Sequence, residues 1–340
     1  MTKTLLLLFI SIFSASHLTY AQEGKILKLP LKIEEGYGPF SGSFGRVGAS
    51  DTNSKENWHP TDLPAKGFPP KWKNFRYGAL ETDFLQWTYQ NYKQGKLSDS
   101  DYIDLQKSWK WTPDENKLSA KPIKCYVHCA WNIDENGHMG DVILDANNNL
   151  DFSDDTIFTA QNFKGFDYRN PLKYAKYFEA EKYVDGKIVK LKCPVALTID
   201  PPYIDYSIPI FAKTSFTENK HKYQIAVSCG FGGTDFSYSK IQLVKDYSTK
   251  IEDGELITEG EYITIGDKTY KHLGVDANKM TLNLEEVNTK NEIYSKQIGY
   301  KAFPFSGKEV NSGEEITLQK YKGKYVFIDF WGTWCAGCAM

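Results

Sequence analysis

The sequence predicts a mixed fold, in which a β-rich N-terminal region with a few helices is followed by the beginning of an α/β domain. The chain contains 22 Tyr, 20 Phe and 8 Trp, and aromatic side chains favour strands. From about residue 121 to 290, apolar and polar residues alternate as they do in strands. The last apolar run, YVFIDFW, is apolar on both faces, which is typical of a central strand covered on both sides.

The N-terminus has the features of a secretory signal over residues 1–21. Lys3 supplies positive charge, Leu5 to Phe13 form an apolar run, and the sequence Thr19-Tyr20-Ala21 suits a cleavage site. The run is short for a bilayer span, so a retained anchor is the less favoured alternative. We therefore expect a soluble, exported protein in the periplasm or another extracytoplasmic compartment. A net charge of −2 gives no reason to expect nucleic acid as a partner.

Residues 22–120 are predicted to form a loop-rich and helical segment. Gly, Pro, Ser and Asn dominate its first part, which indicates loops with short strands. The stretch GALETDFLQWTYQNYKQG then predicts a helix that Gly95 can end. A second helix follows in SDSDYIDLQKSW, with Ser98 or Ser100 as the candidate N-cap.

Residues 121–295 are predicted to form a β-rich domain. The clearest strand is IKCYVHCAWNID, whose alternation indicates a half-buried strand with His128 on its polar face. The turn Glu135-Asn136-Gly137 predicts a hairpin into MGDVILD. The glycine-rich stretch after KYQIAVSC is also interpreted as a hairpin turn. The other predicted strands are GKIVKLKCPVALTID, KYQIAVSCGF, SKIQLVKD, EYITIGD and KMTLNLEEV.

Residues 296–340 begin with a predicted hairpin in FPFSGKEVNSGEEITL and continue into YVFIDFW. Directly after that strand, Cys335 and Cys338 form a CxxC pair next to Trp334. At a strand-to-helix turn the first sulfur lies at the helix N-terminus, where backbone N–H groups favour its thiolate. Such a thiolate attacks a disulfide, and the second thiol then displaces the partner.

The stretch IDFWGTWCAGC resembles the active site of thioredoxins. Together with the signal sequence and ITLQKYKGKYVFIDFW, it is most similar to exported TlpA/ResA-type thiol–disulfide oxidoreductases, over about the last 45 residues. The resemblance implies that Cys335 is the nucleophile, that Cys338 is the resolving thiol, that Trp334 shields the site, and that Asp329 relays the proton of the resolving thiol. It also implies a protein disulfide as substrate, an electron donor as second partner, and no required organic cofactor.

Two departures from the family pattern affect these expectations. The sequence Ala302-Phe303-Pro304-Phe305 is one residue out of step with the usual Ala-Pro-x-Phe. The helix, later strands and cis-proline that follow the CxxC in the family are absent from the sequence, whereas a complete domain needs roughly 100 residues or more. We therefore expect an incomplete redox domain in a truncated chain, and little activity from these 340 residues alone.

Two other classes of function stay open. One is a non-catalytic binding module, β-rich and calcium-stabilised, with an incomplete redox tail. The other is a thiol peroxidase, although Thr333 lies only two places before Cys335 and the Trp-flanked CxxC favours disulfide exchange. A zinc site is disfavoured because zinc usually takes four ligands and no second such pair is present.

The stretch DANNNLDFSDD resembles a calcium-binding loop of the EF-hand or dockerin kind. Oxygen-bearing side chains alternate along it, as a hard cation requires. Leu150 and Thr156 stand where Gly and Glu are expected in such a loop. The alternative is a turn stabilised by its own Asx side chains. The predicted ligands of a structural calcium ion are Asp145, Asn147, Asn149, Asp151 and Asp155.

The other four cysteines are Cys125, Cys129, Cys193 and Cys229. The first two lie on one face of one strand, roughly 13 Å apart, which is too far for a disulfide. Pairing across strands with the other two and burial as small apolar side chains are both compatible with the sequence. Export to an oxidising compartment favours at least one structural disulfide.

Overall fold

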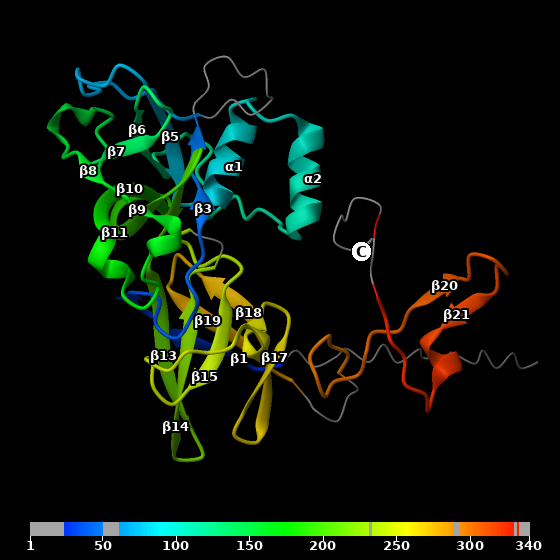
Figure 1. Cartoon of the computed structure of the whole chain (residues 1–340). Helices are drawn as coiled ribbons and strands as arrows, with labels where there is room; N and C mark the ends of the chain where they lie inside the picture. The colour runs from blue at the N-terminus through cyan, green and yellow to red at the C-terminus, as the bar shows by residue number, and fades with distance from the viewer. Residues whose placement is uncertain (1–23, 50–60, 231–232, 288–292, 330–331, 333–340) are drawn as a thin grey trace, which may run out of the picture.

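The computed structural model describes residues 24–49, 61–230, 233–287, 293–329 and Gly332. Over these residues the fold is β-rich with two α-helices, which confirms the predicted fold class. Four sheets gather into one body, and the two helices pack at one end of it (Figure 1). A fifth, two-stranded sheet lies apart from this body.

The first sheet contains the predicted hairpin and has the order β4-β5-β6-β7-β8. The turn between β6 and β7 places Gly137 at φ +83°, a left-handed conformation that glycine adopts without a steric penalty. Its strands are β4 (Gly48–Ala49), β5 (Phe75–Glu81), β6 (Tyr126–Ile133), β7 (Met139–Leu144) and β8 (Phe158–Thr159).

The prediction that β6 is half-buried is wrong, because both of its faces are covered. His128, assigned to the polar face, is 1% exposed, and its Nε2 lies 2.8 Å from the carbonyl oxygen of Leu63. On the same face Tyr126 packs with Trp87 of helix α1 (Phe84–Lys93). The alternation located the strand correctly, but it could not reveal that the helix and the chain near Leu63 cover its second face.

Both predicted helices are present. Helix α1 begins after Asp83, whose side chain accepts the N–H of Gln86, and the following Gly95 is in the left-handed region at φ +66°. Helix α2 (Asp99–Trp109) has Ser98 as its N-cap, one of the two residues predicted. The first helix starts later than its apolar pattern suggested, because Leu80 belongs to β5.

Three further sheets complete the body. The second has the order β10-β11-β12-β3, with β9 beside β11; these strands are β3 (Gly45–Arg46), β9 (Gln161–Asn162), β10 (Lys176–Val184), β11 (Lys187–Asp200) and β12 (Tyr203–Ser207). The third has the order β16-β15-β14-β13-β2; these strands are β2 (Lys32–Glu35), β13 (Ile210–Glu218), β14 (His221–Ser228), β15 (Lys240–Val244) and β16 (Ile257–Thr258). The fourth has the order β1-β19-β18-β17; these strands are β1 (Ile26–Pro30), β17 (Tyr262–Ile265), β18 (Lys268–Asp276) and β19 (Thr281–Val287).

The strand predictions between residues 186 and 287 are confirmed, since they correspond to β11, β14, β15, β17 and β19. Strands β14 and β15 pair antiparallel, as the predicted hairpin requires. The short N-terminal strands do not form a separate layer, because β1, β2 and β3 pair with β19, β13 and β12. One core runs through all four sheets, and its fully buried members include Leu80, Phe178, Ile225 and Leu284.

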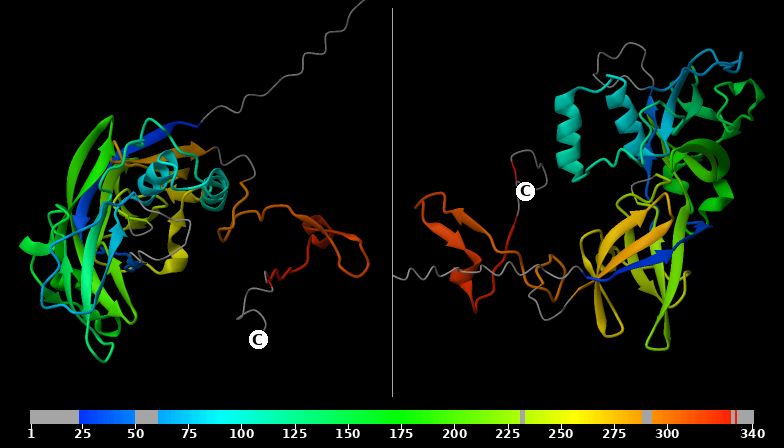
Figure 2. Two further views of the ribbon diagram at one scale, coloured as in Figure 1. Left: turned by 90° about the horizontal axis from the view of Figure 1, so that it is seen from above. Right: turned by 180° about the vertical axis from the view of Figure 1, so that it is seen from behind.

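The chain leaves the body after a short docked connection. The side chain of Gln297 exchanges two hydrogen bonds, each 2.8 Å long, with the backbone of Tyr262 in β17. The predicted hairpin then forms from β20 (Ser306–Lys308) and β21 (Glu315–Thr317). Figure 2 shows this hairpin away from the four sheets in both views. No helix among the described residues is long and apolar enough to cross a membrane.

Candidate functional site

The CxxC motif itself lies beyond the part of the chain that the structure describes. Trp334, Cys335 and Cys338 fall outside the described residues, whereas Asp329 is described and is exposed. For the two thiols, only their spacing in the sequence is therefore established. What the structure adds is the conformation of the chain that leads to them.

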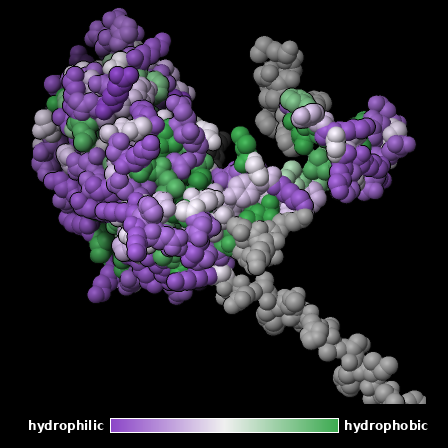
Figure 3. Space-filling model, turned by 90° about the horizontal axis from the view of Figure 1, so that it is seen from below, coloured by the Kyte–Doolittle hydropathy of each residue, from purple (hydrophilic) through white to green (hydrophobic). Residues whose placement is uncertain are grey.

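The prediction of a covered strand at YVFIDFW is wrong for its described part. Residues 325–329 form no strand, and Tyr325 and Phe327 are 108% and 92% exposed. A strand that is apolar on both faces needs hydrogen-bonded neighbours and two covering layers. The described residues supply neither next to this run, and hydrophobic side chains remain at the surface of the projecting segment (Figure 3).

The expected structural disulfide is also absent among the described residues, where Cys125, Cys129, Cys193 and Cys229 are all free thiols. Pairing across strands fails because no cysteine lies opposite another. Cys129 of β6 lies opposite Gly78 of β5 and Leu144 of β7. Cys193 of β11 lies opposite Phe178 of β10.

These four thiols are kept protonated by their surroundings. Burial raises the pKa of Cys129 and of Cys229 to about 12 and that of Cys193 to about 11, and it raises the pKa of Cys125 as well. Since the thiolate is the nucleophile, none of the four is a reactive thiol near neutral pH.

The predicted calcium loop connects β7 to a short 3₁₀ turn, and its side chains hydrogen-bond within the loop. The buried Asp145 accepts the backbone N–H groups of Asn149 and Leu150, each at 2.9 Å. Leu150 adopts φ +68°, the left-handed conformation for which calcium loops use Gly. The side chains of Asn147 and Asn149 both donate to one oxygen of Asp154 at 3.0 Å.

The remaining predicted ligands lie at the end of the same loop. The Asp151 side chain accepts the backbone N–H of Ser153 at 3.0 Å, and it forms an ion pair with Lys66 at 3.2 Å. One oxygen of Asp155 accepts the N–H of Ala146 at 3.1 Å, and the other is buried without a hydrogen-bond partner. Burial, then the neighbouring carboxylates, raises the pKa of Asp155 to about 6.

Among the described residues, no cluster of three or more His, Cys, Asp or Glu side chains is arranged to hold a metal ion. The hydrogen bonds of the loop are those of Asx turns, so the loop holds its shape with its own side chains. Calcium binding through the mixed carboxylate and amide set stays a prediction.

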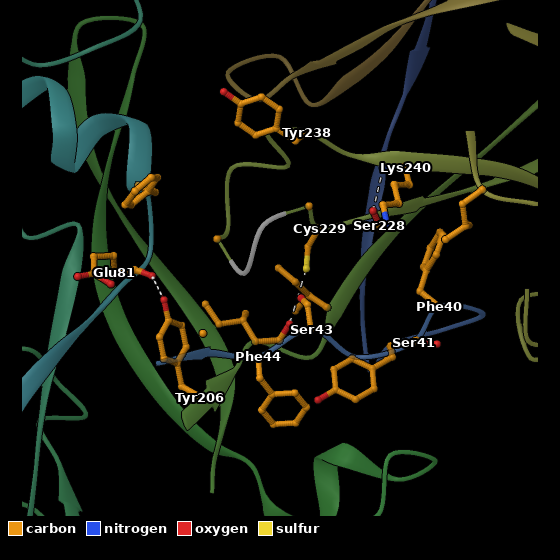
Figure 4. A pocket seen from close by; sticks show the side chains of 18 of the residues that line it. Phe40, Ser41, Ser43, Phe44, Glu81, Tyr206, Ser228, Cys229, Tyr238 and Lys240 are labelled. Carbon is orange, nitrogen blue, oxygen red and sulfur yellow. Dashed lines mark hydrogen bonds between the residues drawn. The ribbon is translucent and has the colours of Figure 1, made fainter. Parts of the chain in front are cut away.

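The body also contains a cavity of about 780 Å³ that the sequence did not reveal. It lies where β3, the end of β5, β12, the end of β14 and β16 meet. Figure 4 shows Glu81 and Tyr206 on one side, Phe40 and Ser41 on the other, and Cys229 between them. The Tyr206 hydroxyl donates to the carbonyl oxygen of Glu81 at 3.3 Å. No motif marks these residues, because they come from four separate stretches of sequence.

The comparisons with known proteins add a partial likeness. The chain is similar to the thioredoxin-like protein YneN of Bacillus subtilis (strain 168), with 45% identity over 56 residues. The match covers 16% of this chain and 32% of that relative, so the chain spans about a third of the length of the relative it matches. No family model matches the chain, and no solved structure matches it. The likeness shows a thioredoxin-like region in an otherwise unmatched β-rich protein.

Proposed function

We propose that the protein is an exported thiol–disulfide oxidoreductase of the TlpA/ResA type. The observation that carries this proposal is the sequence Trp334-Cys335-Ala336-Gly337-Cys338 directly after an apolar run. The thioredoxin-like similarity over 56 residues supports a redox role. The inert state of the four thiols in the body supports it too, because it leaves the CxxC pair as the thiols available for exchange.

The proposed reaction passes two electrons to a disulfide in a partner protein. The thiolate of Cys335 attacks one partner sulfur, the partner S–S bond breaks, and the second partner sulfur leaves and takes up a proton. Cys338 then loses its proton and attacks the sulfur of Cys335. This step closes the Cys335–Cys338 disulfide and releases the first partner sulfur as a thiol. A dithiol donor in the same compartment must reduce the pair again.

The experiment is a disulfide-reduction assay on the protein purified from its native source, with insulin as substrate and dithiothreitol as reductant. We expect reduction faster than with dithiothreitol alone, and loss of this gain in a Cys335→Ser variant. Cys229→Ser is the matched control and should keep the gain. Equal rates for the native protein and Cys335→Ser would contradict the proposal, and turnover of hydrogen peroxide instead would favour a thiol peroxidase.

A calcium-stabilised binding module is the second candidate function. The observation that favours it is the combination of a large cavity with a loop rich in carboxylate and amide side chains. It predicts ligand binding that weakens on chelation of calcium, together with no reduction of insulin.

A further inference from the structure

We propose that the cavity in the body binds a small organic cation, namely a protonated amine carried on an apolar body. This site goes beyond the redox function, and it requires neither Cys335 nor Cys338. The volume of about 780 Å³ is in the range of about 300–1,000 Å³ that small-molecule sites occupy. The inference rests on the rings that line the cavity and on the charges around it.

Six of the residues that line the cavity are aromatic. They come from the loop before β3, the start of α1, β12 and the stretch after β14, so they face the space from several sides (Figure 4). Rings supply apolar contact area, and their faces attract a cation. The aromatic lining residues are Tyr37, Phe40, Phe44, Phe84, Tyr206 and Tyr238.

The acidic groups of the lining are not matched by cations. Glu81 and Glu259 both line the cavity, and no lysine or arginine in the described part of the chain forms an ion pair with Glu81. Arg46 lines the cavity too, but its guanidinium already pairs with Asp205 at 2.9 Å and Asp200 at 3.2 Å.

The surroundings of Glu81 favour a positive charge. Burial and then the nearby Asp62 raise the pKa of Glu81 to about 7. An ammonium group next to this carboxyl would replace its lost hydration and favour its ionised form. Lys240 is the remaining cationic lining residue, and it is exposed. Glu259 is exposed as well, so an anionic ligand would meet the partly buried Glu81 among the rings, while Glu259 and the free Lys240 both lie at the surface.

A second, smaller cavity of about 310 Å³ extends the same environment, because both cavities share Phe84 and Tyr238. Its lining adds Trp109 and Asp235. Asp235 also raises the pKa of the neighbouring Asp83, after burial, to about 7. The ring-lined space thus continues toward more carboxylates, which suits a ligand longer than its charged group.

The test is isothermal titration calorimetry of the full chain with three probes that share an indole ring: tryptamine, indole-3-propionate and indole. We expect binding of the cationic tryptamine, weaker binding of neutral indole, and no detectable binding of the anionic indole-3-propionate. A Glu81→Gln variant should bind tryptamine at least about tenfold more weakly. Glu179→Gln is the matched control, since Glu179 pairs with Lys190 in the β10–β11 hairpin and does not line the cavity.

If Glu81→Gln does not fold, a second variant tests whether tryptamine binds in this cavity. Ser43 is an exposed lining residue, so Ser43→Trp should occupy part of the cavity without disturbing the core and should weaken tryptamine binding. The proposal is overturned if tryptamine does not bind at millimolar concentration, if indole-3-propionate binds equally well, or if Ser43→Trp leaves the affinity unchanged. Because none of these readouts involves thiol chemistry, failure here is distinct from failure of the redox function.

Discussion

The four-sheet body and the segment from residue 293 to 329 differ in how far their apolar side chains are buried. In the body Leu80 and Phe178 are fully buried, whereas Tyr325 and Phe327 of the later segment are almost fully exposed. Both regions carry apolar runs of similar length. The difference teaches that an apolar run becomes a strand only where neighbouring strands complete its hydrogen bonds and side chains cover its faces.

The cysteines repeat this contrast. Those of the body lie in the core with raised pKa values, as in Cys129 and Cys229. The CxxC pair follows an exposed run instead. A thiol that exchanges with a partner protein cannot be packed like a core side chain, so the proposed exchange fits the CxxC pair and not the thiols of the body.

The largest expected effect concerns thiol reactivity. A pKa of about 12 for Cys129 and Cys229 is roughly three units above that of an ordinary thiol, so their thiolate fraction at about pH 8 is roughly a thousandfold lower. We expect iodoacetamide to modify them at least that much more slowly in the folded protein than in about 8 M urea. Mass spectrometry of peptides over time measures both rates. If either thiol in the folded protein were modified as fast as in urea, the contrast between buried and reactive thiols would be wrong.

The second expected effect concerns stability. Phe178 is fully buried in the main core, so Phe178→Ala should lower the free energy of unfolding by about 3–5 kcal/mol. Phe327 is 92% exposed, and Phe327→Ala should change it by less than about 0.5 kcal/mol. Urea denaturation followed by Trp fluorescence compares the two variants. Similar losses for both would show that the segment shares the core of the body.

A smaller effect should appear in the pH dependence of stability. Burial raises the pKa of Glu81 and of Asp83 to about 7, above the values of an unfolded chain, so the folded state binds more protons between about pH 4.5 and 7. Stability should therefore fall as the pH rises through this window and level off above it. We expect a Tm a few degrees higher at about pH 5.5 than at about pH 8.

The Glu81→Gln variant provides the control for this pH effect. It removes one of the two groups, so the difference in Tm between the two pH values should shrink while the fold is kept. A difference of unchanged size in the variant would mean that Glu81 does not contribute to the pH dependence.

The smallest expected effect is that of calcium. If the loop binds the ion, millimolar calcium should raise the Tm by a few degrees, and a chelator should reverse the rise. Asn147→Ala removes a predicted ligand on an exposed part of the loop and should abolish the effect. Asn136→Ala, in the β6–β7 turn, is the matched control. A Tm that does not respond to calcium would leave the loop with its Asx turns alone.

The sequence predicted the fold where a local signal decides the structure. The caps and glycines of the helices and the alternation in β11 or β19 act over a few residues, so these elements were found. Burial on both faces of β6 was missed because it depends on the distant chain near Leu63 and on Trp87.

The candidate sites follow the same rule. The calcium loop and the CxxC motif are contiguous in sequence and could be named from it. The cavity could not, because Glu81, Tyr206 and Phe40 become neighbours only when three sheets meet. The free state of Cys193 likewise depends on the register of β10 and β11, which places Phe178 opposite it.

The central claim is that disulfide exchange occurs at the CxxC pair and not in the body. The most direct test is to trap a mixed disulfide with a Cys338→Ser variant, in which the resolving thiol is missing, and to locate the modified cysteine by mass spectrometry. The account predicts that a partner, or a disulfide-linked reporter peptide, is attached to Cys335 alone. Attachment to Cys193 or Cys229, with Cys335 unmodified, would contradict it.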